Sequence, residues 1–258
     1  MIRIQHVWPI ATNTVREAVR NKLLYALLFF AVLVIGAAVV IASLSYVEGE
    51  RIIQDIGLAS IRLFSLGIAV FVGVGLIHGE VERRTIYTIL SKPLSRAEFL
   101  IGKYLGLLMT VWLELACMGL AFVGVSWVTG ATLDGGHAAA LLLFAMELVI
   151  VVALATFFSA FTSPLLASLF TLGLWAAGHL SRDLYALGQQ SESENFSLVS
   201  QALYKLLPDL ESFNVSIQAV HGLPIAPAEI VWPILYALGY SIALLTAASW
   251  IFQGRDLK

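Results

Sequence analysis

Residues 79–103 read GEVERRTIYTILSKPLSRAEFLIGK, the one dense cluster of charged side chains in a chain that is otherwise apolar. Pro93 interrupts this segment, because proline lacks a backbone donor and keeps the preceding residue out of the helical region. A new helix is predicted at once, since Ser95 can cap it and Glu98 follows three residues later as the capping-box partner. The segment therefore predicts two short helices that meet in a rigid elbow, with a solvated loop as the alternative.

The first half of the elbow has an amphipathic pattern. Its apolar face is formed by Ile86, Ile89 and Leu90. Charged residues crowd its start, namely Glu82, Arg83 and Arg84. This pattern is typical of a helix that lies on a boundary rather than one that crosses lipid.

On both sides of the elbow the composition is that of an integral membrane protein. The 258 residues are 59% hydrophobic and only 12% charged, far from the shares of a soluble domain. Six stretches are long enough to span a bilayer: 24–47, 58–77, 104–128, 138–161, 164–180 and 230–252. Only helices satisfy their own backbone in lipid. The predicted fold class is an all-α membrane protein with six transmembrane helices in a single domain, 1–258.

The lysines and arginines predict the orientation. Of the 15 in the chain, eleven fall on one side: Arg3, Arg16, Arg20, Lys22, Arg83, Arg84, Lys92, Arg96, Lys103, Arg255 and Lys258. The other four, assigned to the opposite side, are Arg51, Arg62, Arg182 and Lys205. By the positive-inside rule, both termini and the elbow are expected in the cytoplasm.

Two further segments are expected to lie at the membrane surfaces. Residues 1–23 carry apolar residues at helical spacing and predict an in-plane helix on the inner leaflet, with an extended tail as the alternative. The first apolar run exceeds the core of a cleavable signal peptide, so we expect a retained anchor. Residues 181–228 predict an outer segment of short helices, in which Asn195 caps one helix and Pro208 ends it, with a floppy loop as the alternative.

Two carboxylates fall inside predicted spans. Glu114 and Glu147 each lie about ten residues into a span, near mid-depth at 1.5 Å per residue. A charge at that depth costs about 2.5 to 3.5 kcal/mol on insertion scales. They are therefore expected either to line a translocation path or protomer interface, or to be protonated and bonded to a neighbouring helix through Thr110, Thr156 or Ser159.

Glycines at four-residue spacing predict close helix packing, at Gly75 with Gly79 and at Gly102 with Gly106. The five histidines are scattered without the spacing of a zinc or haem site, so no metal is expected. No His-Glu-x-x-His or Gly-x-Ser-x-Gly motif is present, and no catalytic residue is predicted.

The elbow carries a specific resemblance. Its pattern is Glu82-x-x-Thr85-Ile86-x-x-x-Leu90-Ser91-x-Pro93-Leu94-Ser95-Arg96-x-Glu98-Phe99-Leu100-x-Gly102-Lys103. It resembles the signature of type-2 ABC transporter permeases, and it follows the second span as in that family. Residues 157–167, 207–214 and 251–257 are also similar to the family. The likeness covers nearly the whole chain and is greatest to compact bacterial permeases such as those of nitrous-oxide-reductase maturation and gliding-motility systems.

The resemblance implies a six-helix permease, expected to be an exporter in the bacterial plasma (inner) membrane. It implies pairing with a second permease, identical or homologous, and with two separate ABC ATPase subunits that receive the elbow as a coupling helix. The ATPase-coupling residues would then be Glu82, Arg83, Arg84, Thr85, Ile86, Ile89, Leu90, Pro93 and Arg96. No nucleic acid partner is implied.

The sequence itself also indicates that ATP is hydrolysed on a partner protein, because the chain lacks a Gly-x-x-x-x-Gly-Lys-Ser/Thr loop. No cofactor is expected on this chain, and ATP and Mg are expected on the partner ATPase. Two other function classes stay open. One is an ion-coupled secondary carrier that uses Glu114 and Glu147, and the other is a membrane-embedded enzyme or scaffold.

Overall fold

The structure is a computed structural model, and it describes residues 4–45, 48–76, 95–191 and 193–253. The first half of the chain forms α1 (Ile4–Val19), α2 (Lys22–Ala42), α3 (Gly49–Gly67), the π-helical turn η1 (Ile68–Val72) and α6 (Arg96–Thr129). The second half forms α7 (Gly135–Ser159), α8 (Pro164–Gln190), α9 (Glu194–Leu206), the 3-10 turn η2 (Glu211–Phe213), α10 (Ser216–Val220) and α11 (Pro227–Gln253). The described residues contain no strand.

The predicted fold class is confirmed, because six helices among the described residues are long and apolar enough to cross a membrane. They cover Lys22–Ala42, Gly49–Leu76, Ala97–Thr129, Gly135–Ser159, Pro164–Gln190 and Pro227–Ile251. The second begins nine residues before the predicted residue 58, because the polar turns of α3 continue the same helix. The chain is therefore a multi-pass membrane protein.

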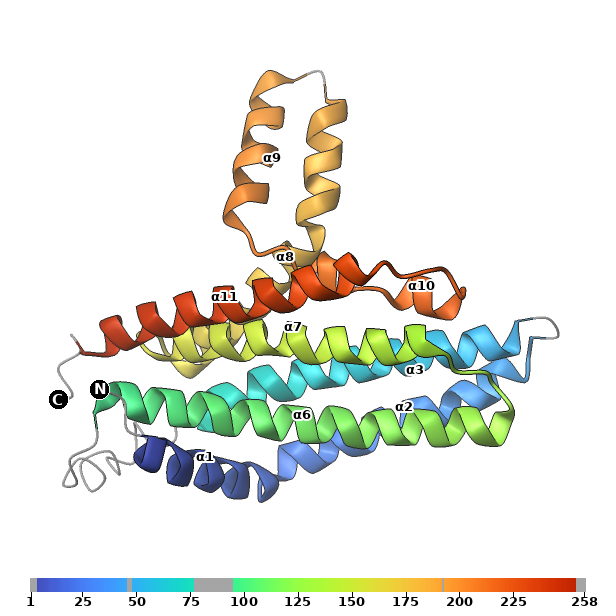
Figure 1. Cartoon of the computed structure of the whole chain (residues 1–258), viewed down its shortest axis with the longest axis horizontal. Helices are drawn as coiled ribbons and strands as arrows, with labels where there is room; N and C mark the ends of the chain where they lie inside the picture. The colour runs from blue at the N-terminus through green and yellow to red at the C-terminus, as the bar shows by residue number, and fades with distance from the viewer. Residues whose placement is uncertain (1–3, 46–47, 77–94, 192, 254–258) are drawn as a thin grey trace.

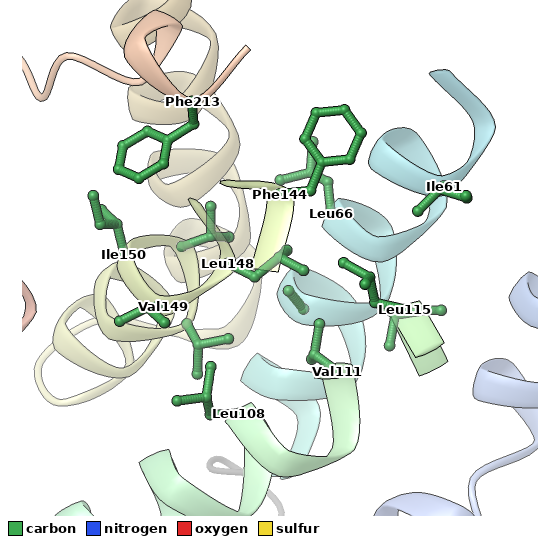
Figure 2. Packing of buried hydrophobic residues seen from close by; sticks show 14 of the residues in the cluster. Ile61, Leu66, Leu108, Val111, Leu115, Phe144, Leu148, Val149, Ile150 and Phe213 are labelled. Carbon is green, nitrogen blue, oxygen red and sulfur yellow. The ribbon is translucent and has the colours of Figure 1, made fainter. Parts of the chain in front are cut away.

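The core is built around α7. This helix contacts α3, α6, α8, α10 and α11, and it lies between α6 and α11 (Figure 1). Its aliphatic and aromatic side chains are buried from Leu143 to Ala155 with few interruptions. Figure 2 shows Leu148 and Val149 of α7 packed near Leu108 and Val111 of α6. The middle of α7 is therefore enclosed by protein.

The elbow prediction is partly wrong. Ser95 does cap α6: its Oγ accepts the Glu98 N–H at 3.2 Å, and the Glu98 carboxylate accepts the Ser95 N–H at 2.9 Å. The predicted capping box is confirmed. However, the second elbow helix is not a separate short helix, because residues 96–129 form one continuous helix of 34 residues. The capped start of α6 is thus rigidly joined to the third spanning segment.

The N-terminal helix α1 packs along the first turns of α6. Glu17 accepts a hydrogen bond from the Nζ of Lys103 at 3.3 Å, and the Lys103 side chain is buried. A Cβ at Gly106 would lie 2.6 Å from the backbone oxygen of Ala11, so the two helices touch at that glycine. The helix predicted in residues 1–23 exists, and its in-plane orientation stays a prediction.

The predicted outer segment begins later and has a different cap. Helix α8 continues to Gln190, so the first ten residues of the segment belong to a spanning helix. The cap of α9 is Ser193 rather than Asn195, and α9 ends at Leu206, just before Pro208. The end of α8 and α9 form a hairpin that stands away from the other helices (Figure 1), with the rings of Tyr185 and Tyr204 4.9 Å apart.

Candidate functional site

Five side chains from four separate elements converge next to the middle of α7. We call them the charge cluster: Arg62 of α3, Glu147 of α7, Trp175 and His179 of α8, and Glu211 of η2. At its centre is Glu147, whose side chain is only 4% exposed. Inside a membrane protein, polar groups of this kind mark functional sites by default.

Glu147 accepts three hydrogen bonds. Its Oε2 accepts from the Nε of Arg62 at 3.1 Å. Its Oε1 accepts from the Nε1 of Trp175 at 2.6 Å and faces the Nε2 of His179 at 2.9 Å. These contacts come from α3 and α8, so the buried carboxylate of Glu147 joins three helices.

The helices position these groups by ordinary spacing. Trp175 and His179 lie four residues apart and therefore share one face of α8, with ring centroids 4.8 Å apart. Phe144 precedes Glu147 by three residues on α7. The guanidinium of Arg62 lies 5.3 Å from the centroid of the Phe144 ring, which is a cation–π contact. The π-helical turn η1 begins six residues after Arg62, and such turns are frequent at functional sites.

The cluster continues from α8 into η2. The Oε2 of Glu211 lies 3.0 Å from the Nδ1 of His179, and its Oε1 accepts from the Nδ2 of Asn214 at 3.0 Å. Burial of Glu211 opposes its ionisation, but the hydrogen bonds from His179 and Asn214 outweigh burial and hold the pKa of Glu211 below its ordinary value. Beside it, Arg182 and Asp209 form an ion pair at 2.7 Å.

The two predicted intramembrane carboxylates have different environments. Glu147 contacts Arg62, Trp175 and His179, and none of the hydroxyls named as examples for a bonded glutamate, Thr110, Thr156 and Ser159. Glu114 is 3% exposed, and neither carboxylate oxygen has a hydrogen-bond partner among the described residues. The hydroxyl of Thr110 bonds instead to the carbonyl of Gly106, and that of Thr156 to the carbonyl of Val152, so neither serves a glutamate.

The packing glycines also differ from one another. A Cβ at Gly102 would lie 2.7 Å from Ile10, and one at Gly106 would meet Ala11 and Thr14, so both glycines face α1. At Gly75 a Cβ would find open space. Gly79 lies outside the described residues.

The predicted coupling residues mostly cannot be placed. Glu82, Arg83, Arg84, Thr85, Ile86, Ile89, Leu90 and Pro93 lie outside the described residues. Arg96 is the first residue of α6. The structure therefore locates the end of the elbow and leaves its docking residues as predictions.

Sequence reasoning missed Arg62, Trp175, His179 and Glu211 as a site. The count of basic residues placed Arg62 on the outer side, although the predicted span 58–77 contains it, and the structure shows it within the helix Gly49–Leu76. A signal existed, because an arginine inside a predicted span requires a carboxylate partner, and Glu147 was already known to need one. In the part of the chain that the structure describes, no group of three His, Cys, Asp or Glu side chains could hold a metal ion.

Comparisons with a family model and with individual proteins both point to ABC transporters. Residues 8–257 match the model of a family described as ABC-2 family transporter protein. A probable ABC transporter permease protein, NosY, of Stutzerimonas stutzeri is 34% identical over 126 residues, which is 46% of this chain and 46% of that protein. NosY of Pseudomonas aeruginosa is 34% identical over 104 residues, 39% of this chain and 38% of that protein. The chain thus spans less than half the length of the curated relatives it matches.

Proposed function

Since this chain belongs to the ABC-2 family of transporter proteins, we propose that it is the permease subunit of an ATP-driven exporter. The observation that supports this best is the family match over 250 residues from 8 to 257, together with six helices of spanning length. The elbow sequence lies between the second and third of these helices, where the resemblance expects a coupling element.

Energy is supplied by separate ATPase subunits in this proposal. The chain has no Gly-x-x-x-x-Gly-Lys-Ser/Thr loop, so ATP and Mg bind to the partner and not to this subunit. The complex contains two ATPase subunits and a second permease, identical or homologous. It resides in a bacterial plasma membrane with both termini in the cytoplasm, as the excess of basic residues on one side predicts.

The elbow is the proposed contact with the ATPase. Its apolar residues Ile86, Ile89 and Leu90 dock in a cleft of the partner. The charged residues Glu82, Arg83, Arg84 and Arg96 fix the register, Thr85 lies between them, and Pro93 sets the bend. Because α6 is one rigid helix from Arg96 onward, a push on the elbow is transmitted directly along the third span.

Glu114 is the residue we propose for the translocation path. It is buried, and its oxygens lack hydrogen-bond partners among the described residues, so a path that opened beside α6 would offer a substrate or water an unpaired carboxyl group. Glu147 is already engaged by the charge cluster. The two carboxylates therefore have separate roles in this proposal.

The coupling proposal is tested by co-purification of this chain with its ATPase. Arg96→Glu reverses a charge at the elbow and is expected to weaken ATPase binding at least about tenfold, the equivalent of 1.4 kcal/mol. Arg51→Glu is the matched control, because it reverses a charge in the first turns of α3, on the predicted opposite side of the membrane. Unchanged assembly and transport in the Arg96 variant would show that the elbow assignment is wrong.

A further inference from the structure

A continuous row of polar contacts leads from a cavity to the buried carboxylate of Glu147. The cavity has a volume of about 340 Å³ and lies between the η2–α10 segment and the start of α11. Its lining includes Glu211, Asn214, Gln218, Arg182 and the exposed Trp232. Glu211 contacts His179, and His179 contacts Glu147. Water in the cavity thus reaches the first member of the row.

The two ring nitrogens of His179 each face a carboxylate. Nδ1 lies 3.0 Å from Glu211 and Nε2 lies 2.9 Å from Glu147. A neutral imidazole has only one N–H, so one carboxylate oxygen would then face a nitrogen lone pair. An imidazolium donates to both carboxylates, which is the arrangement that satisfies every contact.

Arg62 does not donate a hydrogen bond to the bare ring nitrogen that a neutral His179 would have. One guanidinium nitrogen lies 3.2 Å from Nδ1 and 3.0 Å from Nε2 of His179. The in-plane directions of the two ring nitrogens diverge, so an atom nearly equidistant from both is aligned with neither. The carboxylates, each next to a single ring nitrogen, are the natural acceptors.

The sum of the charges also favours a protonated His179. Arg62 contributes one positive charge, and Glu147 and Glu211 contribute two negative charges. With both carboxylates ionised, these four groups are neutral together only when His179 carries a proton. Because unpaired charge is expensive away from water, the balanced state is strongly preferred while the cluster is closed.

We propose that His179 is a proton-binding site reached through the cavity beside Glu211, and that its proton holds the η2–α10 segment against α7 and α8. Loss of the proton removes one donor and leaves a net negative charge between two carboxylates. In the tautomer that keeps its N–H on Nε2, toward the more deeply buried Glu147, the lone pair of Nδ1 faces Glu211 and that contact becomes repulsive. The segment detaches as pH rises, because η2 loses the polar contact that joins it to α8.

Other charged and titratable groups face this site from the surrounding elements. They are Arg62 from α3, Glu147 from α7, Arg182 from α8 with its partner Asp209, and two residues of α11: Glu229, which lines the same cavity as Glu211, and Tyr236, whose hydroxyl accepts the backbone N–H of Asp209. The Arg182–Asp209 pair adds no net charge. His179 is therefore the group in this cluster that titrates between about pH 5 and 8 when it is unperturbed.

Hydrogen exchange on the purified full chain in lipid nanodiscs tests the proposal. The reporters are the amides of Phe213, Asn214 and Ala219, which are hydrogen-bonded within η2 and α10. Protection factors, corrected for the intrinsic pH dependence of exchange, are compared between about pH 5.5 and pH 8. We expect protection to fall about tenfold on raising the pH, which is the free-energy equivalent of one pKa unit.

Matched histidine variants decide the outcome. His179→Gln should abolish the pH step, whereas His221→Gln should keep it, because His221 is exposed at the end of α10 and outside the cluster. A step that survives in His179→Gln, or an unchanging wild type, overturns the proposal. The isolated chain is used without an ATPase, so failure here is distinct from failure of the transport proposal.

A second measurement covers the case in which His179→Gln does not fold. Nitrogen NMR of the wild-type chain labelled at histidine reports the protonation of each ring nitrogen directly. At about pH 5.5, two protonated nitrogens at His179 support the proposal. One protonated and one bare nitrogen overturns it.

Discussion

The Nε atom of Arg62 lies 3.1 Å from Oε2 of Glu147, which joins α3 to α7 across 85 residues of sequence. The arginine side chain is 18% exposed and the glutamate side chain 4%. Both charges are largely removed from solvent, so each depends on the other and on the remaining cluster for compensation. The pair fixes the position of α3 against the most enclosed helix of the fold.

Removal of Arg62 is expected to be strongly destabilising. Arg62→Ala leaves Glu147 buried without its guanidinium, and breaking a buried pair in this way costs about 3 to 5 kcal/mol. The double variant Arg62→Ala, Glu147→Ala should lose less than the sum of the single variants, because no charge is stranded. Equilibrium unfolding of the purified chain in detergent measures all three.

Arg51→Ala is the control for that series. Arg51 pairs with Glu48 at 2.9 Å, but both side chains are about half exposed, so water screens the pair. We expect a change within about 0.5 kcal/mol. Equal losses at Arg51 and Arg62 would contradict the assignment of a buried, energetically coupled cluster.

The two buried glutamates should respond oppositely to an apolar replacement. Glu114→Leu removes a carboxyl group that has no partner among the described residues, and is expected to leave stability unchanged or raise it. Glu147→Leu leaves Arg62 and the Trp175 N–H unpaired and should cost about 3 kcal/mol or more. Thermal unfolding compares the variants, and transport assays then show whether Glu114 is needed for function. A stability loss as large at Glu114 would mean that its carboxyl has a partner after all.

A methyl group at Gly106 should disturb the contact between α1 and α6. The added Cβ would lie 2.6 Å from both the Ala11 carbonyl oxygen and the Thr14 Cβ, so the helices must separate. Gly106→Ala is expected to destabilise the chain by about 1 to 3 kcal/mol, as overpacking does. Gly124→Ala on the same helix meets no atom within 4 Å and should be neutral or stabilising. Proteolysis of residues 1–20 provides the measurement, and equal susceptibility in both variants would refute the packing role.

The lowered pKa of Asp134 predicts that the start of α7 loses stability in acid. The hydrogen bond from His137 is the main cause that holds the pKa of Asp134 below its ordinary value, and the backbone N–H groups of His137 and Gly136 add to it. A lowered folded-state pKa contributes stability above the ordinary pKa, and that contribution is lost as pH falls through the lowered value. Asp134→Asn should therefore be less stable than wild type at pH 7, and the two should converge in acid.

Asp55→Asn is the matched control for the pH experiment, because Asp55 is an exposed aspartate within α3. This variant makes the same aspartate-to-asparagine change while leaving the capping box of α7 intact. Thermal midpoints measured between about pH 3 and pH 7 compare the three chains. A constant gap between Asp134→Asn and wild type at every pH would show that the cap does not depend on charge.

Local features of this protein could be predicted from sequence alone. The six apolar stretches needed no tertiary information, because spanning length and hydropathy are properties of a continuous segment. The capping box of Ser95 and Glu98 was also readable, since its two partners are three residues apart. The boundary errors have one cause: α3, α6 and α8 continue as helices through polar turns, which a test of apolar length does not count.

The sequence by itself thus determined that the chain is a helical membrane protein with six spans and a capping box at Ser95, because these depend on interactions within a few turns. Only the tertiary structure decided that Glu147 meets Arg62, His179 and Trp175 while Glu114 meets no described partner. The two glutamates look alike in sequence, each a single carboxylate in an apolar helix. Their difference arises from which helices pack against α6 and α7, and the low dielectric of that packed interior makes an ionic partner decisive.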